Sequence, residues 1–302
     1  METKVGTNSY APVHKKKTQK FCVTIPIYKE TLNIDEEISL KRLHKVLKDK
    51  SNVYAFCPID INLDKYLEIF PELQRMEFEP ENFASIYAYS QLCLKYEFYD
   101  AFSMYEYMYI YQLDCYLLED NLEYWCDQEY DYVGAPILVA HADWRNFRIN
   151  PDNKVIISPA VGNGGFSLRN IKTFKYLTNP NEELRQKYEL TDEKLKEVKY
   201  EDVYFCSFLN ELYEIEKPDY KIALKFGIDM NPDLAYNYFN FEGFPMCIHA
   251  FDKNIPFWID KIDDFNSEEL FNYCLNKNKV FIEEYYFKDE KWPKPLTFLH
   301  VK

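Results

Sequence analysis

Short, continuously apolar segments that alternate with helical patterns limit what this chain can fold into. Buried strands are predicted at residues 21–27, 53–57, 107–113 and 131–136. A helical stripe of Leu40, Leu43 and Leu47 follows the first strand, and residues 83–94 carry another helical pattern. Such strands alternating with helices are typical of a parallel sheet covered on both faces. We therefore predict an α/β fold with a mostly parallel central sheet flanked by helices.

Polar residues at the ends of the predicted strands are the first candidates for a site. Sheets of this kind bind ligands outside the carboxyl ends of their strands, where Tyr28, Asp60 and Asp114 lie. Asp114 ends the run Tyr-Ile-Tyr-Gln-Leu-Asp, so its carboxylate is expected at the sheet edge. It can hold a divalent cation there, because hard cations prefer oxygen ligands, or it can simply cap the next turn.

Glycine is scarce, which makes its positions informative. Only 7 of the 302 residues are glycine, and three of them lie in Val161-Gly-Asn-Gly-Gly-Phe166. Glycine permits close approach of the backbone to a ligand. The segment matches neither the dinucleotide fingerprint nor a phosphate-binding P-loop. It predicts a ligand-contacting loop or a tight connection between strands.

Two further groups of residues carry potential chemistry. Glu201 and Asp202 open a helical apolar run, where the helix dipole favours acids and where a general base is well placed if the helix faces a cleft. His249, one of five histidines, ends the apolar run Met-Cys-Ile-His. It is either structural or, beside Asp114, the imidazole of a carboxylate–imidazole metal site.

Charge and cysteine usage restrict the partners and the compartment. The net charge of −14 argues against nucleic acid, whose phosphates an acidic surface repels. The one dense basic run, at residues 14–17, lies in a polar arm predicted to be flexible, with at most peripheral membrane contact. Eight isolated cysteines show no zinc spacing, and no long apolar stretch occurs. We expect a reduced protein of the cytoplasm or of the inner face of the membrane.

In their order along the chain, these segments resemble a GT-A-type glycosyltransferase. The matching segments are Val-Thr-Ile-Pro-Ile-Tyr-Lys-Glu30, Tyr-Gln-Leu-Asp114, Tyr-Asp-Tyr-Val-Gly-Ala-Pro136, Gly-Asn-Gly-Gly-Phe-Ser-Leu-Arg169 and Glu-Asp-Val-Tyr204. They are similar to a bacterial domain family, long described as of unknown function, whose members occur in surface-polysaccharide gene clusters. The last two are also distantly similar to the beta-1,3-galactosyltransferase and fringe families. The resemblance implies a flexible arm at 1–20, a single GT-A-like domain at 21–258 and a C-terminal extension at 259–302 packed on it.

The resemblance also implies a donor and a cation. The donor would be a nucleotide-sugar, with a UDP-sugar expected, and the acceptor a hydroxyl of a glycan, glycolipid or lipid-linked oligosaccharide. The implied donor-binding residues are Ile27, Tyr28, Asp60, Gln112, Asp114, Asn163, Gly164 and Gly165. Asp114 and His249 would hold Mn²⁺ or Mg²⁺. Position 112 is Gln where the family's Asp-x-Asp motif has Asp, which leaves metal dependence open.

For catalysis, the resemblance implies that Asp202, beside Glu201, is the base of an inverting direct displacement, although the sequence leaves retention open. Sugar rings stack on aromatic side chains, so Trp144, Tyr204 and Trp258 are candidates for the acceptor site. The incomplete motif leaves an alternative, a non-catalytic nucleotide-sugar or carbohydrate-binding protein on the same scaffold. A nicotinamide oxidoreductase is disfavoured, because the turn after the first strand has no glycine fingerprint.

Overall fold

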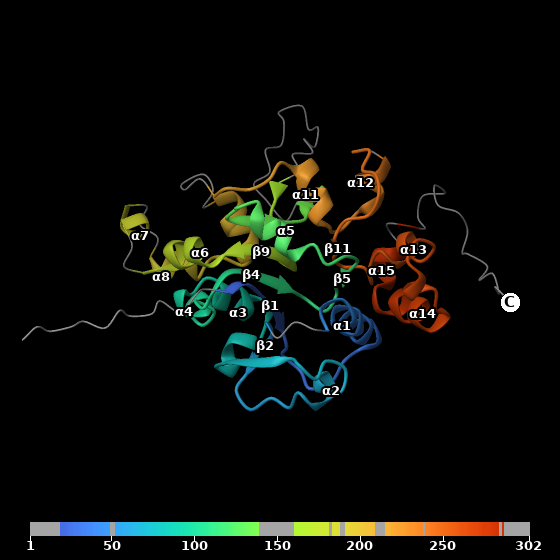
Figure 1. Cartoon of the computed structure of the whole chain (residues 1–302), viewed down its shortest axis with the longest axis horizontal. Coiled ribbons are helices and arrows are strands. Elements are labelled where there is room, and N and C mark those ends of the chain that lie inside the picture. Colours follow the sequence, from blue (N-terminus) through green and yellow to red (C-terminus); the bar gives the residue numbers. More distant parts are fainter. Residues whose placement is uncertain are drawn as a thin grey trace, which may run out of the picture.

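A mostly parallel sheet forms the centre of the computed structural model (Figure 1). The model describes residues 19–48, 52–138, 160–180, 183–187, 191–208, 215–237, 239–283 and 286. Within these residues the central sheet has six strands, which lie side by side in the order β3 (Gln74–Phe78), β2 (Val53–Pro58), β1 (Gln19–Pro26), β4 (Tyr105–Tyr111), β9 (Phe166–Asn170) and β6 (Tyr132–Gly134). The first four run parallel to one another, and β9 is antiparallel to both of its neighbours. Of the arm predicted at 1–20, residues 19 and 20 belong to β1, and residues 1–18 lie outside the described residues, as does Trp144.

Strand β4 shows why the predicted strands are apolar throughout. Tyr107, Tyr109 and Tyr111 belong to the apolar cluster on one face of the sheet, whereas Met108 and Ile110 belong to the cluster on the other. Successive side chains of a strand point to opposite faces, so where the strand is covered on both sides, from Tyr107 to Tyr111, every side chain is buried. The central strands are therefore buried in two layers of core.

Helices cover both faces of this sheet. The helices are α1 (Ile34–Leu47), α2 (Asp64–Leu67), α3 (Ile86–Cys93), α4 (Tyr96–Asp100), α5 (Leu122–Asp127), α6 (Ile171–Thr178), α7 (Glu183–Lys187), α8 (Asp192–Leu195), α9 (Glu201–Val203), α11 (Tyr220–Phe226), α12 (Pro232–Asn237), α13 (Ile255–Trp258), α14 (Glu268–Lys277) and α15 (Lys279–Ile282). Helical turns also occur at η1 (Pro80–Phe83), η3 (Tyr204–Phe208) and η4 (Asp263–Phe265). Side chains of α1 and α5 pack on the Tyr109 face, and those of α3, α4 and α6 pack on the Met108 face.

Local sequence explains where the principal helices begin. The Glu36 carboxylate accepts a hydrogen bond from the Asn33 N–H at 2.7 Å, and the stripe predicted on α1 is buried. The Ser85 hydroxyl accepts from the Ala88 N–H at 3.1 Å and caps α3. Both contacts satisfy N–H groups that a helix start leaves unpaired.

Two small sheets extend the carboxyl side of the central one. The first contains β10 (Gly227–Ile228), β11 (Cys247–Ile248) and β5 (Tyr116–Leu117), with β10 parallel and β5 antiparallel to β11. The second pairs β7 (Pro136–Ile137) with β8 (Ala160–Val161). Because β5 begins two residues after Asp114, the first small sheet brings β10 and β11 to the end of β4.

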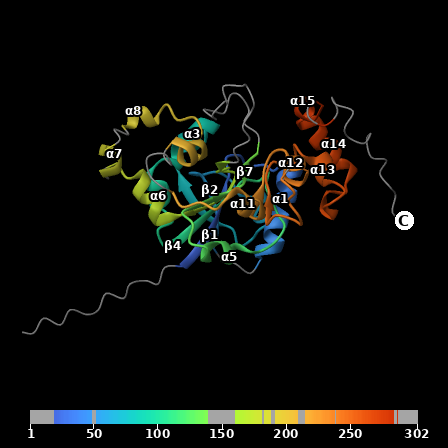
Figure 2. The same cartoon turned by 90° about the horizontal axis from the view of Figure 1, so that it is seen from above.

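A third apolar cluster joins the C-terminal helices to this small sheet. It contains side chains of α13 and α14 together with Tyr116, Ile228 and Ile248. Both cartoon views show α13, α14 and α15 beside α1, at the end of the molecule away from α7 and α8 (Figures 1 and 2). Among the helices that the structure describes, none is both long and apolar enough to cross a membrane.

Candidate functional site

The glycine-rich segment between β8 and β9 lies against the carboxyl end of β4. The Gln112 N–H donates to the Gly165 carbonyl at 2.8 Å, and the Cys115 thiol donates to the same carbonyl at 3.4 Å. The Asn163 side-chain oxygen accepts from the Gly165 N–H at 2.9 Å. These bonds fix the loop beside Asp114, at the sheet edge where the sequence predicts a ligand site.

The two central glycines of this loop have no room for a side chain. A Cβ on Gly165 would stand 2.1 Å from His249 Nε2, and one on Gly164 would stand 3.0 Å from the Asp202 Cβ. The imidazole and the acid therefore approach the same backbone from two sides. We predicted that these glycines border a donor sugar. The structure gives a second reason for them, because His249 and Asp202 pack too closely on the backbone to leave room for a Cβ.

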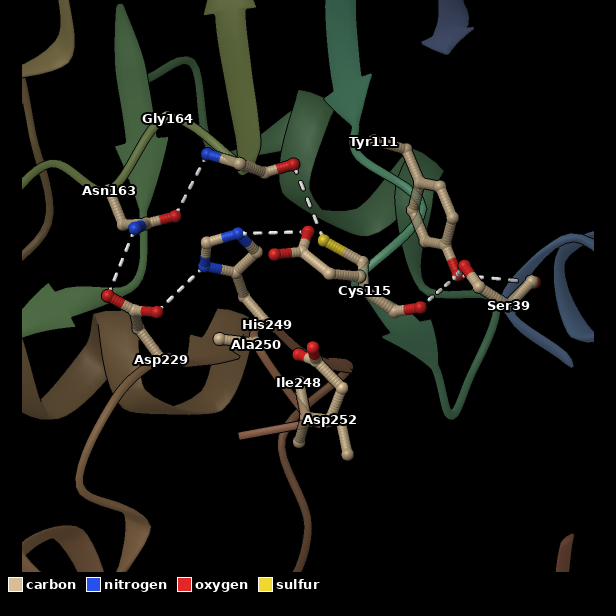
Figure 3. A network of polar contacts seen from close by, with 12 residues as sticks. Ser39, Tyr111, Cys115, Asn163, Gly164, Asp229, Ile248, His249, Ala250 and Asp252 are labelled. Carbon is tan, nitrogen blue, oxygen red and sulfur yellow. Dashed lines mark hydrogen bonds and ion pairs between the residues drawn. The ribbon is translucent and has the colours of Figure 1, made fainter. Parts of the chain in front are cut away.

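His249 lies between two carboxylates (Figure 3). Its Nδ1 is 2.7 Å from Asp229 Oδ1, and its Nε2 is 3.2 Å from Asp114 Oδ1. The second oxygen of Asp229 accepts a hydrogen bond from the Asn163 amide at 3.0 Å. Asp114, His249 and Asn163, predicted separately from the sequence, thus meet in one network with Asp229, which the sequence reasoning missed.

The parallel pair of β10 and β11 brings Asp229 to the site. Ile228 pairs with Ile248 in this register, so the next residues, Asp229 and His249, leave the strands side by side. The only sequence signal is a short apolar pair followed by an acid, as at Leu113-Asp114. A two-residue strand is too short for a periodic pattern to reveal it.

Charge is concentrated in this network. Burial alone would raise the pKa of Asp114, but the facing His249, with Lys253 and Lys277 further away, lowers it to about 2. Burial likewise opposes charge on His249, yet Asp114 and Asp229 raise its pKa well above the usual value. The imidazole and the two carboxylates stabilise one another's charged forms, and a cation bound at Nε2 would replace the proton on that nitrogen.

The residues at this point fit a hard divalent cation. The ligand atoms of Asp114, Cys115 and His249 lie within 4.8 Å of one another. Asp114 Oδ1 and His249 Nε2 are buried and face each other at 3.2 Å, and neither has a further hydrogen-bond partner among the described residues. The Asp114 carboxylate suits Mn²⁺ or Mg²⁺, the His249 imidazole is a general ligand of divalent metals, and a carboxylate on its far nitrogen, here Asp229, is the usual support of a metal-binding histidine. Burial raises the pKa of the Cys115 thiol well above normal, so this soft group stays protonated.

Asp202 occupies the other side of the glycine loop. Its Oδ2 accepts from the Gly164 N–H at 3.0 Å and its Oδ1 from the Val203 N–H at 2.7 Å. Burial and the adjacent Glu201 raise its pKa to about 7, although both N–H groups act in the opposite direction. A carboxyl group with a pKa near neutrality is suited to accept and release a proton at physiological pH.

Glu201 has a different environment from its neighbour. Arg169 Nη2 lies 3.0 Å from Glu201 Oε1, and the Ser90 hydroxyl donates to Oε2 at 3.0 Å. Both members of the ion pair are buried. Both carboxylate oxygens of Glu201 therefore already have partners, and its negative charge is one cause of the raised pKa of Asp202.

The predicted nucleotide side of the site is only partly exposed. Tyr28 is 60% exposed after β1, and Asp60 lies in an exposed turn after β2 with a φ of 64°. Ile27, expected beside the nucleotide base, is buried in the core, so its side chain has no open surface to offer. The Gln112 side chain lies close to Tyr89 and supplies no carboxylate to the His249 network.

Two residues predicted to bind the acceptor, Trp258 and Tyr204, are buried in the structure. Trp258 is 1% exposed and packs against Phe257 and Tyr236 in the third cluster. Tyr204 is buried in the cluster on the Met108 face. Neither ring has a face open to a sugar, because each fills the core, and Trp144 lies outside the described residues. Tyr200, next to Glu201, is an exposed aromatic residue that we did not predict.

A separate cavity lies at the opposite edge of the sheet. Its volume is about 590 Å³, and Tyr96, Tyr105, Tyr107 and Lys175 are among its lining residues. These residues surround the start of β4 and one side of α6. The residues that line this cavity are all described by the structure, and none of them is a predicted site residue.

Comparisons with known proteins place this geometry in context. No curated protein sequence matches the chain. The structure is similar to that of the galactosyltransferase LgtC in complex with donor and acceptor sugar analogues, with 12% identity, 84% of this chain and 95% of that chain covered, and a TM-score of 0.51. It is also similar to mouse xyloside xylosyltransferase 1, with 11% identity, 76% and 97% coverage, and a TM-score of 0.50. At such low identity these similarities confirm the predicted α/β fold.

A family model described as a protein of unknown function (DUF5672) matches residues 72–249. The matched segment is more than half of the chain and includes Asp114, Gly165, Asp202 and His249. The chain therefore belongs to the DUF5672 family.

Proposed function

We propose that the chain is a metal-dependent glycosyltransferase that moves a sugar from a nucleotide-sugar to a hydroxyl of a glycan or lipid-linked oligosaccharide. The observation that carries the proposal is the position of Asp202 and of the Asp114–His249 pair on two sides of the Gly164–Gly165 backbone. Glycosyl transfer needs positive charge at the departing diphosphate and a base at the attacking hydroxyl, both close to one sugar carbon.

On the donor side, Asp114 and His249 would hold Mn²⁺ or Mg²⁺. When bound, such an ion neutralises the charge that develops on the departing nucleoside diphosphate. Lys253 adds positive charge near Asp114, which is what an anionic donor requires on a chain of net charge −14. Tyr28 and Asp60, at the ends of β1 and β2, are the proposed contacts to the nucleoside, with a UDP-sugar as the expected donor.

On the acceptor side, Asp202 is the proposed base. It takes the proton of the acceptor hydroxyl while the oxygen forms a bond to sugar C1. The bond from C1 to the diphosphate breaks, and its electron pair leaves with the nucleoside diphosphate. Attack from the face opposite the leaving group inverts the configuration at C1. The Gly164 and Val203 N–H groups hold the carboxylate in place, and Glu201 keeps its pKa near neutrality.

The test is Asp202→Asn, with the exposed Asp260→Asn as the matched control. We expect Asp202→Asn to lower the rate of nucleoside diphosphate release about 10²- to 10⁴-fold, the range for loss of a general base, while UDP affinity in the presence of Mn²⁺ persists. Unimpaired transfer by this variant would remove Asp202 as the base. NMR of the product gives the configuration at C1, and a retained configuration would replace direct displacement.

The second candidate is a nucleotide-sugar or carbohydrate-binding protein without turnover. It is favoured by Gln112, since this position supplies no second carboxylate beside Asp114. UDP binding by calorimetry, with no transfer or hydrolysis across a broad panel of donors and acceptors, would support it over the enzyme.

A further inference from the structure

One lysine of the C-terminal helix α14 joins two loops on the carboxyl side of the sheet. Lys277 Nζ lies 2.5 Å from Asp35 Oδ2 and 2.9 Å from Asp252 Oδ2. Asp35 stands in the first turn of α1, directly after the loop that carries Tyr28. Asp252 follows His249 by three residues. A single ammonium group thus connects the proposed nucleotide side of the donor site to the proposed cation side.

The two carboxylates depend on this lysine. Asp35 is 0% exposed and Asp252 is 2% exposed. The Oδ1 atom of each is buried and has no hydrogen-bond partner among the residues described. Without Lys277, two buried negative charges would face each other, and like charges repel strongly where water is excluded. They can return to water only if the start of α1 and the turn after β11 move apart.

The turn after β11 is also held at other points by the C-terminal segment. The Asn278 amide donates to Asp252 Oδ2 at 3.0 Å, and the buried Tyr286 hydroxyl donates to the buried Asn254 side chain at 2.7 Å. Within the turn, Ala250 has a φ of 51°, a left-handed conformation that persists in a non-glycine residue when its surroundings enforce it. Figure 3 shows Ala250 and Asp252 on the same short stretch as His249.

We infer that Lys277 is a positioning residue, which holds the start of α1 and the His249 turn in the relative placement that one donor molecule needs. The C-terminal helix thereby becomes part of the construction of the donor site. The donor part of this inference rests on the proposed function, whereas the coupling of the two loops does not.

The experiment compares Lys277→Met with Lys277→Arg, which restores the charge, and with Lys279→Met, a nearby lysine that is 68% exposed. Hydrogen–deuterium exchange of the full chain is expected to rise at least 10-fold at residues 34–37 and 249–254 in Lys277→Met, with β4 and β9 unchanged. The dissociation constant of UDP with Mn²⁺ is expected to rise about 10-fold or more, because the turn that carries His249 loses the contact that fixes it relative to α1. Lys277→Arg and Lys279→Met should behave like the unaltered chain.

Asp252→Asn combined with Lys277→Met removes the repulsion and should recover much of the lost protection at 249–254. Should Lys277→Met not fold, Lys277→Gln, which loses the charge but keeps a donor, carries the same comparison. Unchanged exchange at both loops, or lower stability with unchanged UDP affinity, would overturn the inference. An unaltered chain that binds neither UDP nor Mn²⁺ would overturn the proposed function instead, and the exchange pattern would still decide whether Lys277 couples the loops.

Discussion

Replacing Gly165 with alanine tests the packing that brings the two halves of the site together. The new Cβ would stand 2.1 Å from His249 Nε2 and 2.6 Å from Cδ2 and Cε1, whereas ordinary contact begins at 3.4 Å. The ring must therefore retreat by roughly 1 Å or more, because repulsion rises steeply at shorter range. It cannot turn freely, since Nδ1 is bonded to Asp229, and Asp229 is bonded to Asn163.

Two consequences of Gly165→Ala follow from this geometry. Overpacking of a buried site lowers the free energy of unfolding by about 1–3 kcal/mol. A displacement of about 1 Å in a group that acts on the substrate can reduce activity about 100-fold. We expect Mn²⁺ affinity to fall as well, because His249 Nε2 is a proposed ligand and is the atom that the new methyl group displaces.

The assay is urea unfolding together with Mn²⁺ titration of Gly165→Ala, His249→Ala and the double variant. In the His249→Ala background the clashing ring is gone, so Gly165→Ala should lower stability much less, with a coupling free energy of about 1–3 kcal/mol. Gly243→Ala is the control: its Cβ meets nothing within 4 Å, and its φ of +81° adds only a backbone strain of about 1–2 kcal/mol. It should leave Mn²⁺ affinity unchanged.

Equal loss of stability from Gly165→Ala with and without the imidazole would show that the His249 ring does not obstruct the new methyl group. So would a Gly165→Ala variant that binds Mn²⁺ as tightly as the unaltered chain.

Three further predictions concern buried titratable groups. Burial and the neighbouring Glu201 raise the pKa of Asp202 to about 7, so kcat/KM should rise with pH around 7 as this base loses its proton. Glu201→Gln removes a negative neighbour and should move the midpoint of the pH profile to lower pH. An unmoved midpoint would contradict the role of Asp202 as the base. Arg169→Met leaves Glu201 buried without its positively charged partner and should lower the free energy of unfolding, measured by urea denaturation, by about 3–5 kcal/mol. A loss below about 1 kcal/mol would show that the ion pair does not stabilise the fold. All eight cysteines are free and buried, and burial raises the pKa of the Cys206 thiol to about 12. Ellman's reagent should therefore react slowly with the native chain and should detect eight thiols in denaturant. A rapid reaction with the native chain would contradict this burial.

Strands β1, β2 and β4 could be predicted because they are buried on both faces, whereas the central strand β9 was not predicted as a strand. β1, β2 and β4 are continuous apolar runs, and each appears in the structure within two residues of its predicted limits. β3 was missed, because it is an edge strand with the sequence Gln-Arg-Met-Glu-Phe and largely exposed side chains. β5, β10 and β11 were missed for another reason: two residues per strand carry no periodicity.

Site residues could be predicted where they directly follow an apolar run. Asp114 and His249 carry this signal, and the structure brings them within 3.2 Å. Asp229 and Lys277 have their roles through partners distant in the sequence, which only the folded chain supplies. Aromatic residues were the least predictable, because the chain has 27 Tyr and 23 Phe, and many of those that the structure describes fill core positions, as Tyr204 does.

The most direct test of the central claim is a screen of nucleotide-sugar donors with and without Mn²⁺, reading the release of nucleoside diphosphate. We expect at least one donor, a UDP-sugar, to be turned over with Mn²⁺. Turnover should fall sharply with a chelator or in Asp114→Asn, with the fold retained. No release above background from any donor, together with no binding of UDP, would contradict a glycosyltransferase site at the Gly164–Gly165 loop.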